Sequence, residues 1–378
     1  MNPYILSLFT GCFAGILSIF LLTFIITKGK GIIEFWQETM PIMLGILGVG
    51  ILIHLLGTLI ILKSSTSYKE ILNYKVVEVR YFEDWNELVT YTVNHYDSKG
   101  NLTYVEVKTR VDYHGPNWEG LLDNGDEIDI EEKEYERYKV EWNNSTFVEL
   151  GRSYYTDDGD EYISKWNGNF INIFPHQEIN TYENRIRASK SVFNKYTSVD
   201  DSLKELYKHP VYYKSTSNTI LNFCKYPVTT QEAELLAKEN ASLGNRYQVH
   251  SILALFDGNK SIQCAEDMMN AWVGPNKNEL VTCVGVTKTG DVNWCRVYSW
   301  MDNTYIHTHM RQEITKQKFS IATYDRILYN SITEFWHRKH FSDFDYIDVS
   351  LGIDSVFIIF IISLIILNVA GFFIITNQ

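Results

Sequence analysis

Three short stretches of the sequence contain side chains that can bind a metal ion or a small anion. The first stretch holds Asp157, Asp158 and Asp160 around Gly159. Carboxylate oxygens are the ligands that Ca²⁺ and Mg²⁺ take in proteins, but an EF-hand loop needs about twelve residues and a closing Glu, which this stretch lacks. The two interpretations of the stretch are a cation site and the tip of a β-hairpin.

The second stretch follows a buried strand that the sequence predicts. Asp257, Gly258 and Asn259 come directly after this strand, and Thr287 and Lys288 follow its predicted parallel neighbour. In an open α/β sheet, ligands bind outside the carboxyl ends of the strands. Asp257 and Asn259 are therefore candidate ligands for a divalent cation or a small anion. An ordinary solvated loop explains the same residues.

The third stretch holds two histidines. His307 and His309 are separated by one residue, so in a strand both would face the same way, with Glu313 a few residues on. A metal site needs a further ligand of known position. The sequence contains no Ser-His-Asp order, Gly-x-Ser-x-Gly elbow, P-loop or GxGxxG. It therefore assigns no catalytic residue, and the one cofactor that it leaves open is a divalent cation, Ca²⁺ or Mg²⁺.

The composition divides the chain into membrane-spanning and water-soluble parts. Of its 378 residues, 45% are hydrophobic and 14% are aromatic, and the longest apolar runs lie at the two ends. The net charge of −12 therefore belongs almost entirely to the middle of the chain. An acidic surface repels phosphate backbones, which argues against a nucleic-acid partner. The odd number of cysteines, five, argues against a disulfide framework.

Three apolar runs, residues 4–27, 41–62 and 355–375, contain no Asp, Glu, Lys or Arg. Each run is long enough to cross a hydrocarbon layer of about 30 Å as a helix. Lys28 and Lys30 follow the first run instead of preceding it, so we interpret it as a retained anchor and not as a cleaved signal peptide. The sequence predicts a multi-pass protein of three spans in the lipid bilayer, the first two forming a hairpin.

Small and polar residues within these runs indicate how the helices pack. Glycine faces let helices approach closely, either within the chain or in self-association, and polar groups at membrane depth usually face protein. We expect His54 and Asn368 to serve packing, with a proton or ion path as the alternative. The glycines on these faces are Gly11 and Gly15 in the first run and Gly45, Gly48 and Gly57 in the second.

The positive charges beside the spans predict which side of the membrane holds the large domain. Cytoplasmic flanks carry an excess of Lys and Arg. Only two lysines lie in the short loop between the first two runs, and none follows the last run. We therefore expect the soluble domain to be cytoplasmic. The flanking charges on its side are Lys63, Lys69, Lys75, Arg338 and Lys339.

Between the spans, the sequence predicts an α+β domain in two parts. Residues 65–195 form a mostly β module: a β-meander turns at residues 97–101, a charged helix follows, and a second hairpin turns at Asp158 and Gly159. Residues 200–340 alternate helix and strand, which indicates a small mixed sheet with helices packed on it. The fold class is thus a membrane-anchored α+β protein.

Within the second part, the order of elements is helix, buried strand, helix and hairpin. Thr230 is the expected cap of a helix that ends at Gly244. The apolar run YQVHSILALFD predicts a buried strand, and SIQCAEDMMNAW predicts an amphipathic helix. The turn at residues 288–290 joins two further strands. A final helix, ATYDRILYNSITEFWHRKH, leads toward the membrane.

Residues 226–300 resemble the TPM domain of membrane-attached proteins of bacteria and chloroplasts. The shared features are the helix opening PVTTQEAELLAKENASLG, the strand YQVHSILALFD, the helix GNKSIQCAEDMMNAW and the lead Gly-Pro-Asn-Lys-Asn-Glu into LVTCVGV. The family's Asp-containing lead before the first helix and its glycine-rich segment after the last strand are missing here. Segments such as TYENRIRASKSVF also look like those of uncharacterised membrane proteins of bacteria and tailed phages.

Two functional hypotheses follow from the sequence. The leading one is a non-enzymatic, membrane-anchored accessory or interaction protein whose soluble domain binds a protein partner. The competing one, implied by the TPM resemblance, is a metal-assisted phosphatase or hydrolase at the membrane surface. Transport through the spans is a weaker third hypothesis, because three helices with one histidine make a poor pore.

Overall fold

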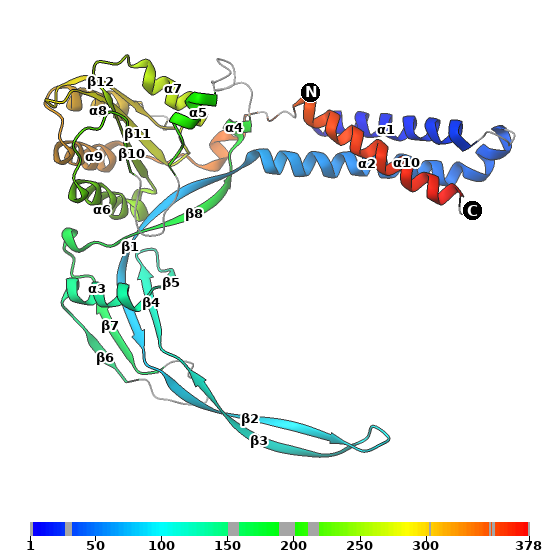
Figure 1. Cartoon of the computed structure of the whole chain (residues 1–378), viewed down its shortest axis with the longest axis horizontal. Coiled ribbons are helices and arrows are strands. Elements are labelled where there is room, and N and C mark those ends of the chain that lie inside the picture. Colours follow the sequence, from blue (N-terminus) through cyan, green and yellow to red (C-terminus); the bar gives the residue numbers. More distant parts are fainter. Residues whose placement is uncertain are drawn as a thin grey trace.

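The computed structural model consists of a helical bundle, an α/β globule and a long β arm, which together form an open C (Figure 1). The bundle and the arm extend toward the same side of the globule. The structure describes residues 3–26, 32–149, 159–188, 201–210, 219–301, 304–347, 349 and 352–376.

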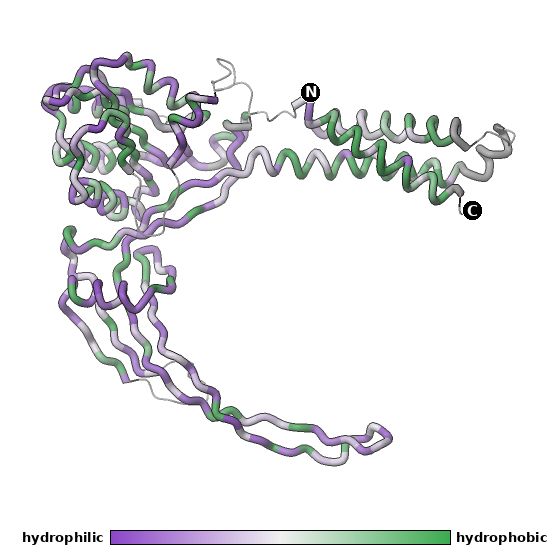
Figure 2. The backbone as a smooth tube through the Cα atoms, viewed as in Figure 1, coloured by the Kyte–Doolittle hydropathy of each residue, from purple (hydrophilic) through white to green (hydrophobic). Residues whose placement is uncertain are grey.

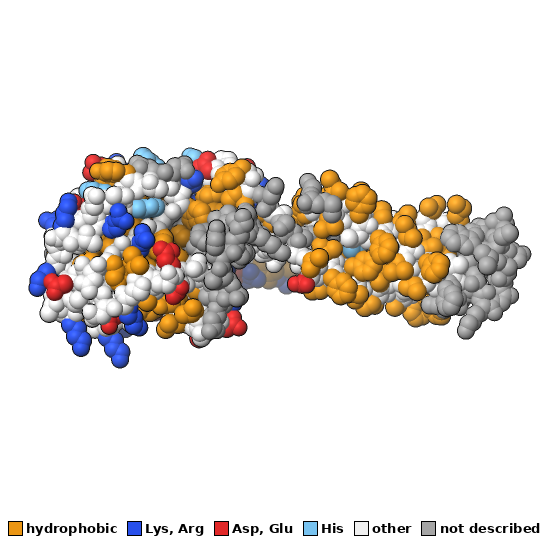
Figure 3. Space-filling view, turned by 90° about the horizontal axis from the view of Figure 1, so that it is seen from above, with side chains coloured by type: hydrophobic (Ala, Val, Ile, Leu, Met, Phe, Trp, Pro, Cys, Tyr) orange, Lys and Arg blue, Asp and Glu red, His pale blue; other side chains and the backbone are white. Residues whose placement is uncertain are grey.

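The bundle contains the three expected spans. Its helices are α1 (Pro3–Ile26), α2 (Ile32–Thr66) and α10 (Ile353–Thr376). All three are long and apolar enough to cross a membrane, and much of their backbone has the hydrophobic colour in Figure 2. Hydrophobic side chains predominate on the described part of the bundle that Figure 3 shows. The predicted start of the second helix at Pro41 is wrong, because α2 begins nine residues earlier and includes Pro41. Helices at membrane depth tolerate proline because neighbouring groups satisfy the freed backbone carbonyl.

The glycines of the bundle differ in what they contact. A Cβ added at Gly11 would lie 2.9 Å from Ile51 Cα, and one added at Gly15 would lie 2.9 Å from a methyl group of Leu47. Glycine therefore allows α1 and α2 to approach closely. Gly57 faces Ile359 of α10. A Cβ at Gly45 or Gly48 would meet nothing within 4 Å among the described residues, so this face of α2 is open.

The polar side chains inside the bundle bind other helices, which confirms the packing interpretation. His54 Nδ1 lies 3.0 Å from Thr10 Oγ1, and His54 is almost fully buried. Asn368 Nδ2 donates to Ser18 Oγ at 3.0 Å. The first contact joins the consecutive helices α1 and α2, and the second joins α10 to α1, so each helps to fix the register of the bundle.

Strand β1 (Ser67–Phe82) continues from α2 without an intervening loop and links the three parts of the molecule. Near the membrane it pairs with β8 (Pro175–Glu183), and further on it pairs with β4 (Asn117–Leu122) and β7 (Glu161–Lys165), in each case antiparallel. The path of the larger sheet is β5-β4-β1-β7-β6. The smaller elements of this part are β5 (Glu127–Asp129), α3 (Glu132–Trp142), β6 (Thr146–Val148), the 3₁₀ turn η1 (Phe170–Asn172) and α4 (Arg185–Ala188).

The arm is a hairpin of β2 (Trp85–Tyr96) and β3 (Leu102–His114), which pair only with each other within the described part of the chain. The turn at residues 97–101 is as predicted: Asp97 Oδ1 accepts from the backbone nitrogens of Lys99 and Asn101, both at 2.8 Å. The predicted meander is wrong, because β1 does not pair with β2. Only Glu83 and Asp84 separate these strands, and β1 instead pairs with β4, β7 and β8.

The globule is built on a four-stranded mixed sheet of order β12-β11-β10-β9. Its strands are β9 (Ile220–Asn222), β10 (His250–Asp257), β11 (Glu279–Val286) and β12 (Val292–Tyr298). Strand β10 is parallel to β9 and β11, and β12 is antiparallel to β11. The mixed sheet and the hairpin between β11 and β12 confirm the prediction.

Helices cover both faces of this sheet. Leu253 and Leu255 of β10 pack against the helices of one face, and Ile252, Ala254 and Phe256 pack on the other. This alternation is the period of a strand that is buried on both faces. The helices are α6 (Thr230–Tyr247), α8 (Tyr305–Thr315) and α9 (Ile321–Phe335) on the first face and α5 (Asp201–Leu206) and α7 (Gln263–Trp272) on the second.

Helix α6 differs from the prediction at both ends. Its N-cap is Thr229, one residue earlier, because Thr229 and Glu232 form a capping box. The helix also runs past Gly244 and ends with Gln248 at a left-handed φ of 48°. Gly244 instead packs against β1, where an added Cβ would lie 2.0 Å from Asn73 O. After α9, the 3₁₀ turn η2 (Phe341–Phe344) leads toward α10.

Candidate functional site

The structure describes only one of the three carboxylates near Gly159. Asp157 and Asp158 lie outside the described residues, and Asp160 lies next to β7, where its carbonyl oxygen accepts from Glu83 N at 2.9 Å. Among the described residues, no group of three or more His, Cys, Asp and Glu side chains is arranged to hold a metal ion.

Asp257 and Asn259 meet in one turn at the carboxyl end of β10. Asp257 Oδ1 accepts from the backbone nitrogen of Asn259 at 2.9 Å and from its amide at 3.1 Å. The neighbouring loop after β11 lies beside this turn, because Gly258 N donates to Val286 O at 3.0 Å. The expected proximity is therefore present, and one carboxylate oxygen of Asp257 serves the turn, as Asp side chains commonly do.

The interpretation of His307 and His309 as neighbours on one face of a strand is wrong, because both lie in helix α8. Residues two apart on a helix point about 200° away from each other. His309 packs against the rings of Tyr305 and Phe335, with ring centroids 5.9 and 5.2 Å away. His307 points elsewhere, and its Nε2 lies 2.6 Å from Ser299 Oγ. The two histidines therefore form no common metal site.

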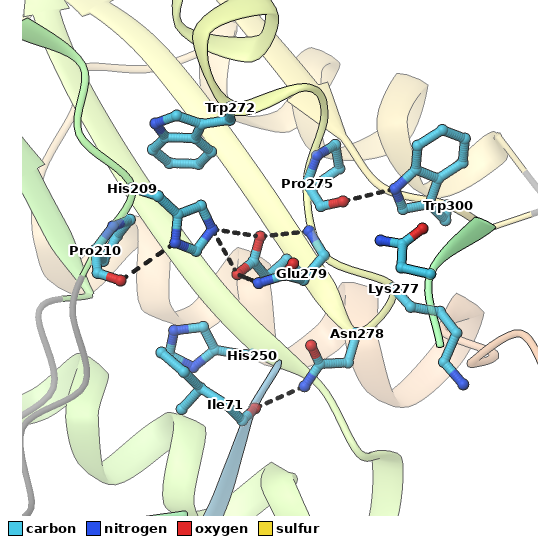
Figure 4. A network of polar contacts seen from close by, with 12 residues as sticks. Ile71, His209, Pro210, His250, Trp272, Pro275, Lys277, Asn278, Glu279 and Trp300 are labelled. Carbon is cyan, nitrogen blue, oxygen red and sulfur yellow. Dashed lines mark hydrogen bonds and ion pairs between the residues drawn. The ribbon is translucent and has the colours of Figure 1, made fainter. Parts of the chain in front are cut away.

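A group of buried polar side chains lies where residues 274–279 meet β1 (Figure 4). At its centre, Glu279 is fully buried, with Oε1 3.0 Å from His209 Nε2. Asn276 donates its backbone and side-chain nitrogens to the same carboxylate, both at 2.7 Å. Burial would raise the pKa of Glu279, but the charge and hydrogen bonds of His209 and Asn276 outweigh it and lower the pKa to about 2. Glu279 is therefore ionised at neutral pH.

His250 lies beside Glu279 and links the globule to β1. Burial lowers the pKa of His250 to about 4, so the ring is neutral at pH 7. Asn73 Nδ2 donates to His250 Nδ1 at 3.0 Å and to Val249 O at 3.0 Å, and Asn73 Oδ1 accepts from Gln177 at 3.1 Å. One asparagine of β1 thus joins β8 and the start of β10.

A second link joins β1 to the segment after α9. Glu70 of β1 is fully buried, forms an ion pair with Arg338 and accepts from Asn180 of β8 at 3.0 Å. Arg338 Nη1 also donates to Gln248 at 2.6 Å. Nearby, burial and the charge of Arg338 lower the pKa of the buried Lys277 to about 8. Arg338, one of the positive charges beside the last span, therefore forms an ion pair inside the soluble domain.

These contacts form what we call the polar clamp, which holds β1 and β8 against the globule. Its side chains are Glu70, Asn73, Gln177, His209, His250, Asn276, Glu279 and Arg338. Sequence reasoning missed this cluster, because its members lie far apart along the chain. One local signal was present: the polar run Asn276-Lys277-Asn278-Glu279 directly precedes a continuous apolar strand. The clamp positions the arm relative to the membrane bundle.

The arm has one uncharged and one charged face. Residues paired across β2 and β3 lie on the same face, and the faces alternate along each strand. Val107 and Val111, each 65% exposed, mark the uncharged face. Its pairs are Leu88 with Val111, Thr90 with Thr109, Thr92 with Val107 and Asn94 with Val105. All the charged side chains of the paired part of the arm lie on the opposite face, where His95 binds Glu106 at 2.9 Å. That face contains Glu87, His95, Glu106, Lys108, Arg110 and Asp112, together with Val89, Tyr91, Val93 and Tyr104.

Comparison with known proteins adds no family: no family model matches the chain, and no curated protein sequence matches it.

Proposed function

We propose that this chain is a membrane-anchored interaction protein, whose arm presents its uncharged face to a protein partner. The observation that carries the proposal is the uncharged face itself, in which exposed valines lie on a ribbon that has no covering layer among the described residues. An isolated two-stranded ribbon is marginally stable in water, and contiguous exposed apolar surface marks interaction sites. A partner that covers this face would stabilise the arm.

The difference between the two faces supports one-sided binding. Val107 and Lys108 are neighbours in sequence but lie on opposite faces of the ribbon. The charged face neutralises part of its own charge, because Lys108 and Glu106 approach within 3.3 Å and Arg110 and Asp112 within 2.9 Å. Burying these ion pairs would cost desolvation, whereas the exposed Val107 and Val111 of the uncharged face gain by losing contact with water. The partner is therefore expected on the uncharged face.

The position of the arm also supports the proposal. Three helices suited to spanning a membrane fix one end of the molecule, and β1 leads from them to the arm. The polar clamp holds β1 and β8 against the globule, so the arm has a defined place relative to the bundle. We propose further that the soluble domain is cytoplasmic and that copies of the chain associate through the open face at Gly45 and Gly48.

Site-specific photo-crosslinking tests the proposal in the cell that naturally makes the protein. A benzophenone amino acid replaces Val107 on the uncharged face or, as the matched control, Lys108 on the charged face. We expect a protein adduct from position 107 and little or none from position 108. The charge-introducing variant V107K, with the crosslinker moved to position 105, is expected to lose the adduct because a lysine there would be desolvated.

Three outcomes would contradict the proposal. Equal adducts from positions 107 and 108 would mean that the arm contacts its surroundings without a preferred face. Absence of any adduct from position 107 would remove the partner. An adduct to lipid would mean that the uncharged face contacts the bilayer. The arm extends toward the same side of the globule as the bundle (Figure 1).

A further inference from the structure

A serine and a histidine lie in contact at the end of strand β12. Ser299 follows this strand directly, and His307 lies in the first turns of α8. Ser299 Oγ and His307 Nε2 are 2.6 Å apart, which is the distance between a nucleophile and its base in hydrolytic enzymes. Both side chains are half-buried, so the pair is partly shielded from water but open to a small molecule. Burial lowers the pKa of His307, which favours the neutral ring that can accept a proton.

The pair opens into a cavity of about 210 Å³. Pro275 and Trp300, which Figure 4 shows joined by a hydrogen bond of 2.7 Å, form part of its wall. Met269 and Val297 add apolar surface, and Asn270 adds an amide. A pocket with mostly apolar walls and a few polar groups is the usual form of a small-molecule site.

Tyr298 also lines this cavity, and its ring packs against the second face of the sheet. Its hydroxyl oxygen is buried, so it is not open to the cavity. Burial and the nearby carboxylate of Glu266 raise the pKa of Tyr298, so the hydroxyl keeps its proton. The two polar groups that a small molecule in the cavity could meet at this end are therefore Ser299 and His307.

We propose that Ser299 is the nucleophile of a hydrolytic site for small carboxylic esters, with His307 as its base. This inference is independent of the proposed function of the arm, because it rests on a different part of the molecule. It also needs no metal ion, and so differs from the metal-assisted hydrolase that the sequence suggested.

The reaction follows from the positions of Ser299 and His307. Ser299 Oγ attacks the carbonyl carbon of the ester while its proton passes to His307 Nε2. The C–O bond to the alcohol then breaks, and the alcohol leaves with the proton from His307. Water attacks the acyl-serine with His307 again as base, releases the carboxylic acid and restores the Ser299 hydroxyl.

The cavity sets the class of substrate. A volume of about 210 Å³ lies below the range of roughly 300–1,000 Å³ that drug-sized ligands occupy, so the acyl group must be short. Glu266 lies in the wall, with Oε1 3.7 Å from Arg296 Nε. A negatively charged acyl group would be repelled by this carboxylate. We therefore expect uncharged acyl groups of a few carbon atoms.

The test is covalent labelling of the full chain in detergent micelles with an alkyl fluorophosphonate. This reagent forms a phosphorus–oxygen bond with an activated serine and expels fluoride. Peptide mass spectrometry then identifies the labelled residue. We expect an adduct on Ser299, loss of the adduct in S299A and a decrease in labelling rate on the order of 100-fold in H307Q. The matched control is H309Q, which changes a histidine of the same helix that has no contact with Ser299.

Hydrolysis of p-nitrophenyl acetate provides a second readout on the same proteins. The rate is expected to fall in S299A and H307Q and to stay unchanged in H309Q. The labelling of the unmodified protein needs no variant to fold, so it decides the question by itself. If folded protein forms no Ser299 adduct, or if H307Q labels as fast as the unmodified chain, the pair is an ordinary hydrogen bond of the loop and the proposal is wrong.

Discussion

The polar clamp is expected to weaken at acidic pH through His250. The folded pKa of His250 is about 4, against about 6.5 in an unfolded chain. The folded state therefore takes up this proton less readily, so the contribution of His250 is complete above pH 6.5 and is lost as the pH falls toward 4. Between pH 7.5 and pH 5, these two pKa values give a loss of roughly 2 kcal/mol in the free energy of unfolding.

Other buried groups titrate in the same range, so the measurement must isolate His250. The variant His250→Asn keeps a polar side chain but cannot be protonated. Thermal unfolding of the full chain in detergent micelles, followed by tryptophan fluorescence at pH 7.5 and pH 5, gives the difference between variant and unmodified protein. The effects of the other titrating groups on the unfolding temperature are the same in both proteins and cancel in this difference.

We expect the variant to be less stable at pH 7.5, because Asn73 loses its hydrogen bond to the His250 ring. The gap should narrow at pH 5 by roughly 2 kcal/mol, which corresponds to about 4–8 °C in the unfolding temperature of a domain of this size. If both proteins change in parallel between the two pH values, His250 is not the group that senses acid, and the account of its burial is wrong.

Three further predictions concern the packing around the clamp and the globule. Burial raises the pKa of Glu239 to about 7, so the contribution of this group to folding stability is present below about pH 4.5 and is lost as the pH rises through 7. Glu239→Gln should therefore raise the unfolding temperature at pH 8 and have little effect at pH 4. A lower unfolding temperature of the variant at pH 8 would contradict this. Arg338→Gln leaves Glu70 buried without its ion pair and should cost about 3–5 kcal/mol, measured by denaturant unfolding, whereas a change below 1 kcal/mol would mean that the pair contributes little. Gly244→Ala forces a Cβ against the backbone of β1 and should expose the junction to limited proteolysis, while unchanged cleavage would show that α6 can shift without loss.

The membrane spans and the mixed sheet were predictable because their signals are local. Each span is a single uncharged apolar run, and β10 is a continuous apolar run between two amphipathic helices. The start of α2 was missed because Pro41 was interpreted as the first helical residue, although proline also fits within a membrane helix. The cap of α6 was misplaced by one residue, since Thr229 and Thr230 are both suitable caps and only the bond to Glu232 distinguishes them.

The helix that contains His307 could have been predicted from the same sequence. Ile306, Met310 and Ile314 recur every four residues and are all buried, which is the period of an amphipathic helix. The alternation of the two histidines suggested a strand only because the apolar positions around them were not considered. With the helix in place, His307 turns away from His309 and toward Ser299, a partner that local sequence patterns do not reveal.

The clamp could not be predicted from local patterns, because the bonds that join β1 to β8 and to the globule each span a long stretch of chain. Asn73 is 104 residues from Gln177 and 177 residues from His250. The predicted meander implied that β1 pairs with β2, the next strand in the chain. Instead β1 pairs with β8, and the residues between these two strands form the larger sheet and the arm. A polar residue in a strand near a membrane is ordinarily assigned to solvent, and only the assembled fold shows that Glu70 and Asn73 are buried.

Because α2 continues directly into β1, the polar clamp also determines how β1 leaves the bundle. Thr66 ends the helix and Ser67 begins the strand, so a spanning helix and the strand that leads to the arm form one continuous element. A flexible linker at this point would let the arm take any orientation relative to the bilayer. The buried bonds of Glu70 and Asn73 instead fix β1 against the globule just beyond the membrane. An uncharged face held in this way can engage only a partner at a defined place relative to the membrane, which is what an anchored interaction protein requires.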